Sequence, residues 1–225
     1  MTTPRFSLPE LAVAQALKEI THNEALAIVD VLLGGTVGSV LATPPGSPTN
    51  GQVVLVAHSG TTGVFVGKED KIAFWLTSVA AWQYITPTTG QKVTDGATST
   101  TYRWNGTLWL ALSGTYTPTL TNVTNVSAST AYPCQWMRVG NVVTVSGRVR
   151  ITATGVGAAE LGISLPVASN FANEYEAAGT GTSDTVADGP MWLEADVTND
   201  RLALKSTQSG TTYHQHFFHT TYLVI

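Results

Sequence analysis

Hydrophobic and polar residues alternate along much of the C-terminal half of the chain. The clearest case lies between Val142 and Ile151, where valines and a glycine at odd positions alternate with threonine, serine and arginine. A period of two residues is that of a strand with one buried face. Turns rich in glycine, asparagine and serine separate further strand candidates, which are Gln135–Val139, Leu161–Leu165, Met191–Ala195, Arg201–Lys205 and Tyr213–Ile225. Such a succession predicts an antiparallel β-sandwich, similar to a jelly roll, over residues 114–225.

Residues 1–40 follow a period close to that of an α-helix. Apolar residues recur every three or four positions in two runs, Leu11, Ala14, Leu17, Ile20 and Ala25, Ile28, Val29, Leu32. Two capping boxes, Ser7–Glu10 and Thr21–Glu24, each place a hydroxyl three residues before a carboxylate. They predict helices over Leu8–Ile20 and His22–Leu33, the second ending at Gly34–Gly35.

The two predicted helices form either a hairpin or one kinked rod, because Thr21 also fits inside a helix. Helices of about twelve residues are only marginally stable alone, so they need a partner surface. That surface is either the rest of the chain or identical helices of other subunits. We therefore expect residues 1–40 to be a docking or assembly segment.

Residues 41–113 predict a small β-unit rich in tryptophan. Adjacent prolines in the run LATPPGS break regular structure at its start, and Asn105–Gly106 marks a tight turn between two short strands. Four of the six tryptophans lie in this unit, at Trp75, Trp82, Trp104 and Trp109. They either build a small core or form a platform for sugar rings, for which the candidates are Tyr102, Trp104 and Trp109.

Charge is scarce in this chain, and this excludes several kinds of partner. Only 12% of the residues are charged, the net charge is −4 and no basic run occurs, so we expect no nucleic-acid partner.

Residues 1–10 lack the pattern of a signal peptide, and no apolar stretch reaches the roughly 18 residues that span a bilayer. We therefore expect neither a standard export signal nor membrane insertion. The single cysteine, Cys134, excludes an intrachain disulfide and favours a small buried apolar side chain.

Reactive side chains are not gathered into a recognisable motif. The sequence contains no phosphate loop, paired-cysteine zinc site or Gly-x-Ser-x-Gly turn, and we expect no cofactor and no enzyme activity. Asp184 lies close to Asp188 in the sequence, and Glu194 lies close to Asp196, but neither pair belongs to a glycosidase motif. The stretch Gly179–Pro190 is predicted as a loop, in which Asp184 and Asp188 either accept hydrogen bonds from sugar hydroxyls or stay solvated without a partner.

Two parts of the chain resemble proteins of virus particles. Residues 8–33, the run PPGSPTNGQVVLVA and the tryptophan-turn-tryptophan unit resemble a domain of unknown function in tail and head fibres of phages and of alphaproteobacterial gene-transfer agents. The matching residues are Gln15, Lys18–Glu19, Thr21–Leu26 and Asp30, with Leu17 where the family has a second glutamine. Residues 116–225 resemble a C-terminal module of phage tail-fibre and receptor-binding proteins, through YTPTLTNVTNV, Arg138–Gly147, LPVASNF and the closing aromatic strand.

The resemblance implies a trimeric, mainly β fibre protein located in the virion. Its N-terminal helices would trimerise the chain or dock it on other virion proteins of the capsid or tail. The C-terminal β-domain would meet a glycan or protein of the host surface. Alternatives are a capsid decoration protein with a mainly structural role and a polysaccharide-degrading spike.

A trimer would also give His214 and His216 a possible role. They are two residues apart on a predicted strand and so share one face. With that strand at the trimer axis, six imidazoles would surround a transition metal. The alternative is a polar strand face, or histidines stacked between aromatic side chains, and we assign no metal site.

Overall fold

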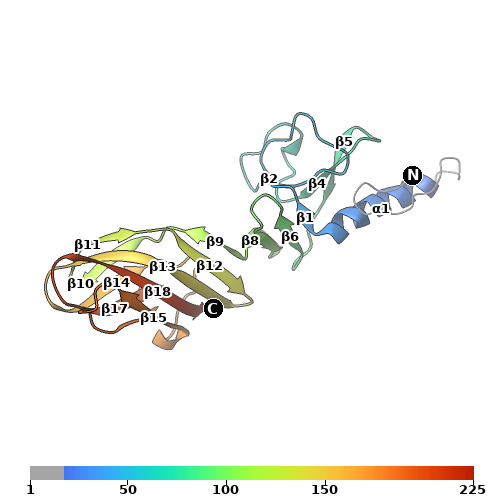
Figure 1. Cartoon of the computed structure of the whole chain (residues 1–225). Coiled ribbons are helices and arrows are strands. Elements are labelled where there is room, and N and C mark those ends of the chain that lie inside the picture. The colour runs from blue at the N-terminus through green and yellow to red at the C-terminus, as the bar shows by residue number, and fades with distance from the viewer. Residues whose placement is uncertain (1–17) are drawn as a thin grey trace. The chain divides into compact units, whose positions relative to one another are not determined.

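The computed structural model describes the backbone from residue 18 onward and the side chains from residue 22 onward (Figure 1). The first predicted helix, Leu8–Ile20, therefore lies mostly outside the described residues. In the part of the chain that the structure describes, strand predominates at 50% and helix amounts to 9%, which confirms the predicted mainly β class. The chain divides into two compact units, one ending at Leu112 and the other spanning Ser113–Ile225.

The first unit combines one helix with two small sheets. Its elements are α1 (Lys18–Gly34), β1 (Thr36–Val37), β2 (Val40–Leu41), β3 (Val53–Val56), the 3-10 helix η1 (Gly63–Phe65), β4 (Ile72–Leu76), β5 (Ala81–Ile85), β6 (Lys92–Asp95), β7 (Thr101–Trp104) and β8 (Trp109–Ala111). One sheet has the order β1-β6-β7-β8 and the other β2-β3-β4-β5. A core of residues from α1, β1, β3, β4 and β6 joins the two sheets.

Helix α1 runs without a break from Lys18 through Thr21, so the helix does not start at the second capping box, and Thr21 lies inside the helix as the other alternative allowed. Because Lys18 is already helical, the backbone N–H groups that Thr21 would cap have carbonyl partners in the preceding turn. The predicted end is confirmed. The helix closes at Gly34, and Gly35 has a φ of 55°, a left-handed conformation that glycine adopts without strain.

The helix buries a narrower face than the sequence pattern suggests. Ala27 and Val31, one turn apart, are 5% exposed each and pack into the core of the unit. Ile28, Val29 and Leu32, which belong to the predicted apolar stripe, remain 40–43% exposed. The first unit therefore leaves part of the apolar surface of α1 uncovered.

The second unit is a curled antiparallel sheet. Its elements are β9 (Ser113–Tyr116), β10 (Leu120–Thr124), β11 (Val126–Ala131), β12 (Cys134–Val139), β13 (Val142–Ala153), β14 (Gly157–Ile163), the 3-10 helix η2 (Glu174–Glu176), β15 (Ala177–Ser183), β16 (Met191–Asp196), β17 (Arg201–Gln208) and β18 (Tyr213–Leu223). The order is β10-β14-β17-β16-β15-β18-β13-β12-β9, with β11 also paired to β13.

Backbone hydrogen bonds continue across this whole series of strands. The predicted division into the two sheets of a sandwich is therefore not seen, and one ten-stranded sheet curls around its own apolar face instead. The alternation of side chains specifies that each strand has a buried face, but not whether a second sheet or the same sheet covers it. The core contains valines, leucines and isoleucines of β13, β14, β16 and β17 together with Phe171, Phe218 and Tyr222.

Strand β15 occupies the first half of the stretch Gly179–Pro190, which was predicted as a loop. The alternation is hidden there because the inward positions hold Gly179 and Gly181. A Cβ on Gly179 would lie 2.6 Å from the His219 carbonyl oxygen, and a Cβ on Gly181 would lie 2.3 Å from that of Phe217. Glycine is thus required where β15 approaches β18, and the loop prediction was wrong for this half of the stretch.

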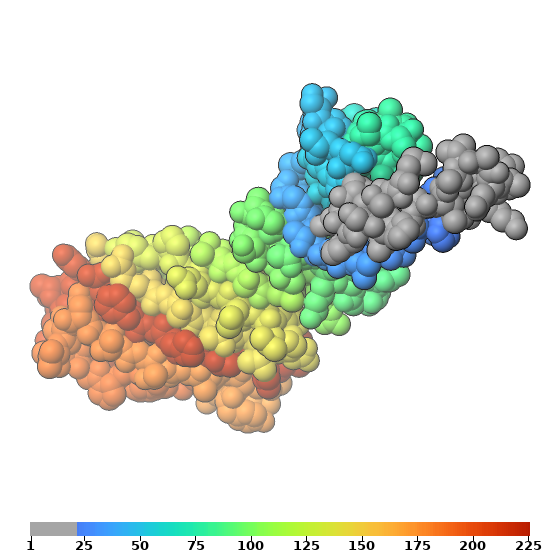
Figure 2. All heavy atoms as spheres, turned by 45° about the vertical axis from the view of Figure 1, so that its right-hand side comes forward, coloured from blue at the N-terminus to red at the C-terminus, as the bar shows by residue number. Residues whose placement is uncertain are grey.

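Strand β18 lies between β13 and β15, as Figures 1 and 2 show for the red segment. The chain after it is also held, because the Val224 N–H donates to the Asn141 carbonyl at 2.7 Å and the Ile225 N–H to the Ser169 carbonyl at 3.2 Å. The predicted C-terminal strand is confirmed, ending two residues earlier.

Replacing Gly147 by alanine should destabilise the second unit. A Cβ at this position would lie 2.2 Å from Cys134 Sγ and 2.8 Å from Cys134 Cβ, and Cys134 is fully buried. Overpacking of this kind costs about 1–3 kcal/mol. Gly155→Ala is the matched control, because the nearest atom to its Cβ is 3.9 Å away. Chemical unfolding followed by circular dichroism measures both variants, and equal stability of the two would contradict the packing seen here.

Candidate functional site

The three side chains of the predicted aromatic platform lie close together on β7 and β8. Trp104 and Trp109 are cross-strand partners with ring centroids 5.5 Å apart, and Tyr102 shares their face. Tyr102 and Trp109 also pack against the core of the first unit. The Trp109 indole N–H donates to the Asp70 carbonyl at 2.7 Å. Much of this aromatic surface therefore serves packing, and Trp104 is the member outside the core.

A larger aromatic surface lies on the other sheet of the first unit. An open groove of about 500 Å³ is lined by three prolines, Val64 and the aromatic side chains of β4 and β5, namely Pro44, Pro45, Pro48, Trp75, Trp82 and Tyr84. Trp82 is buried beneath it, with Trp75 5.7 Å away and Phe65 5.4 Å away between ring centroids. Volumes of roughly 300–1,000 Å³ are usual for small-molecule sites. The groove is therefore large enough to be a candidate site for a small ligand.

The walls of this groove are held by hydrogen bonds at both ends of the proline-rich segment. Before the prolines, the Thr62 hydroxyl donates to the Thr43 hydroxyl oxygen at 2.9 Å. After them, the Thr77 N–H donates to Asn50 Oδ1 at 3.0 Å. The Tyr84 hydroxyl donates to the Val64 carbonyl at 2.7 Å, which fixes its ring against η1. A preformed groove loses little conformational entropy when it binds a ligand.

The pattern of residues along the chain does not reveal this groove. The prolines were interpreted only as a break in regular structure, and Trp75 and Trp82 only as core or platform members. The pairing of β4 with β5 places Trp75 opposite Trp82, and the spacing of residues does not reveal which loop covers that face. The run of three prolines ahead of an aromatic strand was the available signal, since prolines offer rigid apolar walls.

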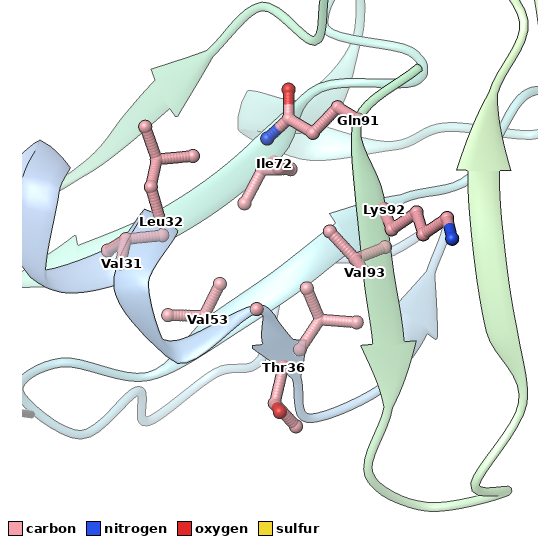
Figure 3. A pocket seen from close by; sticks show the side chains of 10 residues that line it. Val31, Leu32, Thr36, Val53, Ile72, Gln91, Lys92 and Val93 are labelled. Carbon is pink, nitrogen blue, oxygen red and sulfur yellow. The ribbon is translucent and has the colours of Figure 1, made fainter.

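A second hollow in the first unit is too small for a ligand. It lies beside α1, where Figure 3 shows Val31, Val53, Ile72 and Val93 around the space. Its volume is about 10 Å³, room for roughly one water molecule. We interpret it as a packing defect where the helix meets β6.

In the second unit, Asp184 and Asp188 have different surroundings. Asp184 is exposed and accepts the Gln215 N–H at 3.0 Å through Oδ1. The Asp188 side chain is only 1% exposed. Its Oδ2 accepts the Ser183 hydroxyl at 2.6 Å, and its Oδ1 accepts both the N–H and the hydroxyl of Ser209, at 2.9 and 2.7 Å. The Asp188 carboxylate is therefore a buried hydrogen-bond acceptor inside the unit, and of the two acids only Asp184 remains available to a ligand.

His214 and His216 belong to the same buried cluster. His214 Nδ1 lies 2.9 Å from Asp188 Oδ2, and His214 Nε2 lies 3.0 Å from the Thr212 hydroxyl. His216 is 0% exposed, with Nδ1 3.2 Å from the His214 carbonyl and Nε2 3.0 Å from Gln208 Nε2. A carbonyl acceptor at Nδ1 and an amide donor at Nε2 fit a neutral imidazole protonated on Nδ1. Both rings therefore lie on the inner face of β18.

This placement corrects the idea of a histidine site on a trimer axis. Side chains on the inner face of the curled sheet cannot meet copies of themselves from other subunits. Among the described residues, no group of three or more histidine, cysteine or acidic side chains has the geometry of a metal site. The histidines are instead part of a buried polar cluster, in which their hydrogen-bond partners are Asp188, Thr212 and Gln208.

One part of the cluster has an arrangement of side chains that is known from catalytic sites. Asp188, His214 and Thr212 form a chain from carboxylate through imidazole to hydroxyl, the order that activates a hydroxyl nucleophile in hydrolases. Thr212 is exposed, while the side chains of His214 and Asp188 are 9% and 1% exposed. A hydrolase also needs donors for an oxyanion beside the hydroxyl.

A family model described as a protein of unknown function, DUF2793, matches residues 22–110. The match covers α1 from His22 onward, the proline–tryptophan groove and the Trp104–Trp109 hairpin, and it leaves the second unit unmatched. No curated protein is significantly similar to the chain. In the part of the chain that the structure describes, no helix has the length and hydropathy needed to span a membrane.

The buried cluster should make the stability of the protein depend on pH. Burial lowers the pKa of His216, an effect that the nearby Asp188 carboxylate only partly offsets. The unfolded chain then takes up the proton first, so stability is present above the ordinary histidine pKa of about 6.5 and is lost as the pH falls below it. We expect the melting temperature to fall between pH 7.5 and 5.5, and His216→Gln to flatten that slope.

The exposed His219 of the same strand supplies the matched control, His219→Gln. Asp188 acts in the same direction at more acidic pH. Burial alone would raise its pKa, but hydrogen bonds from Ser183 and Ser209 and the charge of His214 hold that pKa below its ordinary value. An unchanged pH slope in His216→Gln, or an equal flattening in both variants, would show that the buried imidazole does not set the dependence.

Proposed function

We propose that this chain is a structural and adhesive fibre protein of a virion, of the phage tail-fibre or head-fibre kind, which attaches the particle to the host cell surface. The proline–tryptophan groove is the observation that carries the proposal. The scarcity of charge and the resemblance of both units to fibre modules support it. The host ligand proposed for the groove is a neutral saccharide.

The groove has the features that sugar binding uses. The C–H faces of a pyranose ring pack on flat aromatic surfaces, and the half-buried Trp75 and Tyr84 supply such surfaces. The hydroxyl oxygen of Tyr84 still has acceptor capacity, because the one bond it makes here uses its proton. Prolines 44, 45 and 48 keep the opposite wall rigid, so the saccharide would enter a groove that already exists.

Replacing Trp75 by alanine should weaken saccharide binding by roughly tenfold. Loss of the indole removes both apolar contact area and an aromatic interaction of about 0.5–1.5 kcal/mol, and 1.4 kcal/mol corresponds to tenfold in affinity. Binding of the full chain to neutral oligosaccharides from host polysaccharide is measured on a glycan array and then by calorimetry.

Tyr175→Ala is the matched control, since this tyrosine of the second unit is 80% exposed and lies outside the groove. It should leave binding unchanged. Neutral saccharides that bind the Trp75→Ala variant as tightly as the unchanged chain would remove the groove from the proposal.

Helix α1 is proposed as the element that assembles the chain into a trimer and docks it on other virion proteins. Its support is the apolar stripe of Ala25, Ile28, Val29 and Leu32, which recurs at helical spacing and lies exposed on the first unit. Identical stripes from three chains can cover one another, which is how coiled coils bury such positions. The occupant proposed for this face is thus the same helix of two other copies.

The double variant Ile28→Ser with Leu32→Ser should lower the mass in solution from about three times 23.7 kDa to one subunit. Light scattering at micromolar concentration measures this. Point changes on the exposed stripe are preferable to removing residues 1–40, because Ala27, Val31 and Val37 belong to the core of the first unit. Val156→Ser with Val186→Ser is the control, because it changes two exposed valines of the second unit. A single-subunit mass for the unchanged chain would end the trimer proposal.

Two alternatives lead to different outcomes. A capsid decoration protein would share this build but label the shell, which an antibody to the chain distinguishes by electron microscopy of purified particles. A polysaccharide-degrading spike is supported by one observation, the chain of Thr212, His214 and Asp188. Release of reducing ends from host capsule by the unchanged protein, abolished in Thr212→Val, would favour the enzyme over the adhesive role.

A further inference from the structure

Two arginines stand side by side on the outer face of the second unit. Arg148 and Arg150 are two residues apart on β13, and the valine and isoleucine that follow them in turn, Val149 and Ile151, are fully buried. Both guanidinium groups therefore project from the opposite face of the sheet. On β18 their cross-strand partners are Phe217 for Arg148 and Gln215 for Arg150.

Aromatic and amide groups hold both arginines in place. The Arg148 guanidinium carbon lies 4.0 Å from the centroid of the Tyr132 ring, and Arg148 Nη1 donates to Gln215 Oε1 at 2.6 Å. The Arg150 guanidinium carbon lies 4.5 Å from the centroid of the Tyr213 ring, and Arg150 Nη2 donates to the Tyr132 hydroxyl at 2.9 Å. Stacking on rings fixes the orientation of the planar groups without neutralising their charge.

Within the described part of the chain, neither arginine of this pair forms an ion pair with a carboxylate. Among the described residues, the ion pairs involve His58, Arg201, Lys205, His214 and His216, and none includes Arg148 or Arg150. In addition, Arg150 Nε is buried without a hydrogen-bond partner. A buried donor without an acceptor costs about 1–3 kcal/mol. Two adjacent positive charges without an ion-pair partner are the feature of a site that gains stability from an oxyanion, which would bind to N–H groups other than the buried Arg150 Nε.

The surroundings of the pair suit a sugar. Tyr213 and Phe217 are 58% and 44% exposed, and they offer flat apolar faces on either side of Gln215. Thr182 faces outward opposite Phe217 on the neighbouring strand β15. The exposed Asp184 carboxylate holds the Gln215 N–H and adds an acceptor for hydroxyl groups at the far side. Guanidinium, aromatic ring, hydroxyl and carboxylate thus occur within one patch of the sheet.

We infer that the patch formed by Tyr132, Arg148, Arg150, Tyr213, Gln215 and Phe217 is a binding site for the oxyanion of an acidic saccharide. The planar guanidinium groups bind a carboxylate or phosphate through paired N–H donors, and the tyrosine and phenylalanine rings pack on the sugar. Asp184 accepts from a neighbouring hydroxyl. The site goes beyond the neutral-saccharide groove proposed above and lies in the other unit, so each can fail without the other.

Calorimetry on the full chain tests this inference with three probes. They are trigalacturonate, which carries carboxylates, a glycerol-phosphate oligomer, which carries phosphates, and neutral galactotriose. We expect an acidic probe to bind, and Arg148→Gln and Arg150→Gln each to weaken that binding at least tenfold. Binding should also fall as salt is raised, because the contact is ionic. The acidic probe that binds more tightly identifies the oxyanion as carboxylate or phosphate.

Arg103→Gln removes the same charge from an exposed position of the first unit and is the matched control. Arg148→Lys with Arg150→Lys keeps both charges but loses the planar donors, so it should bind with intermediate strength and it guards against a misfolded glutamine variant. Equal binding of acidic probes by Arg148→Gln and Arg103→Gln would overturn the site. So would a loss of trimer mass in the arginine variants, which would make the patch a subunit contact instead.

Discussion

The register of β18 between β13 and β15 is the constraint on which the second unit depends. Every residue of this strand has a partner on β13, and those from Ala177 to Ser183 on β15 pair with it from the other side. Because side chains alternate across a strand, a slip of one residue would exchange its two faces. His216 and Phe218 would move to the solvent, while Gln215 and Phe217 would enter the core. A slipped register would therefore lose burial and hydrogen bonds, so the observed register is strongly preferred.

Both polar features of the unit follow from that register. On the inner face, the Asp188 carboxylate joins Ser183 of β15, Ser209 after β17 and His214 of β18. Removing one member would leave a buried charge or donor without a partner, so the cluster opposes any slip of these strands. On the outer face, the same pairing places Gln215 beside the arginines of β13. The same strand register therefore stabilises the buried cluster on the inner face of the sheet and positions the arginine patch on its outer face.

Strands in which apolar and polar side chains alternate, such as Val142–Ile151, were predicted from the sequence. Strand β15 was missed, because its inward positions are glycines. The most informative error concerns Asp188, which resembles a loop residue because its neighbours are small and polar. Its partners in the buried cluster, Ser209 and His214, lie 21 and 26 residues further along the chain, and the local sequence does not predict these contacts. The groove beside Trp75 was missed for a similar reason, since the loop that covers a strand face depends on tertiary packing. The period of α1 revealed its apolar stripe but not which side of the helix the unit would cover.

Low overall charge changes the meaning of the few charges that remain. On a surface crowded with lysine and glutamate, two adjacent arginines would be screened by acidic neighbours and would attract little. Here only 12% of the residues are charged, and the side-chain contacts of Arg148 and Arg150 are with Gln215, Tyr132 and Tyr213, not with carboxylates. Their field is then cancelled mainly by salt, over a distance of about 8 Å at physiological ionic strength. A protein with net charge −4 can therefore keep one cationic patch that selects an acidic ligand, while the rest of its surface offers hydroxyl groups and rings to neutral ones.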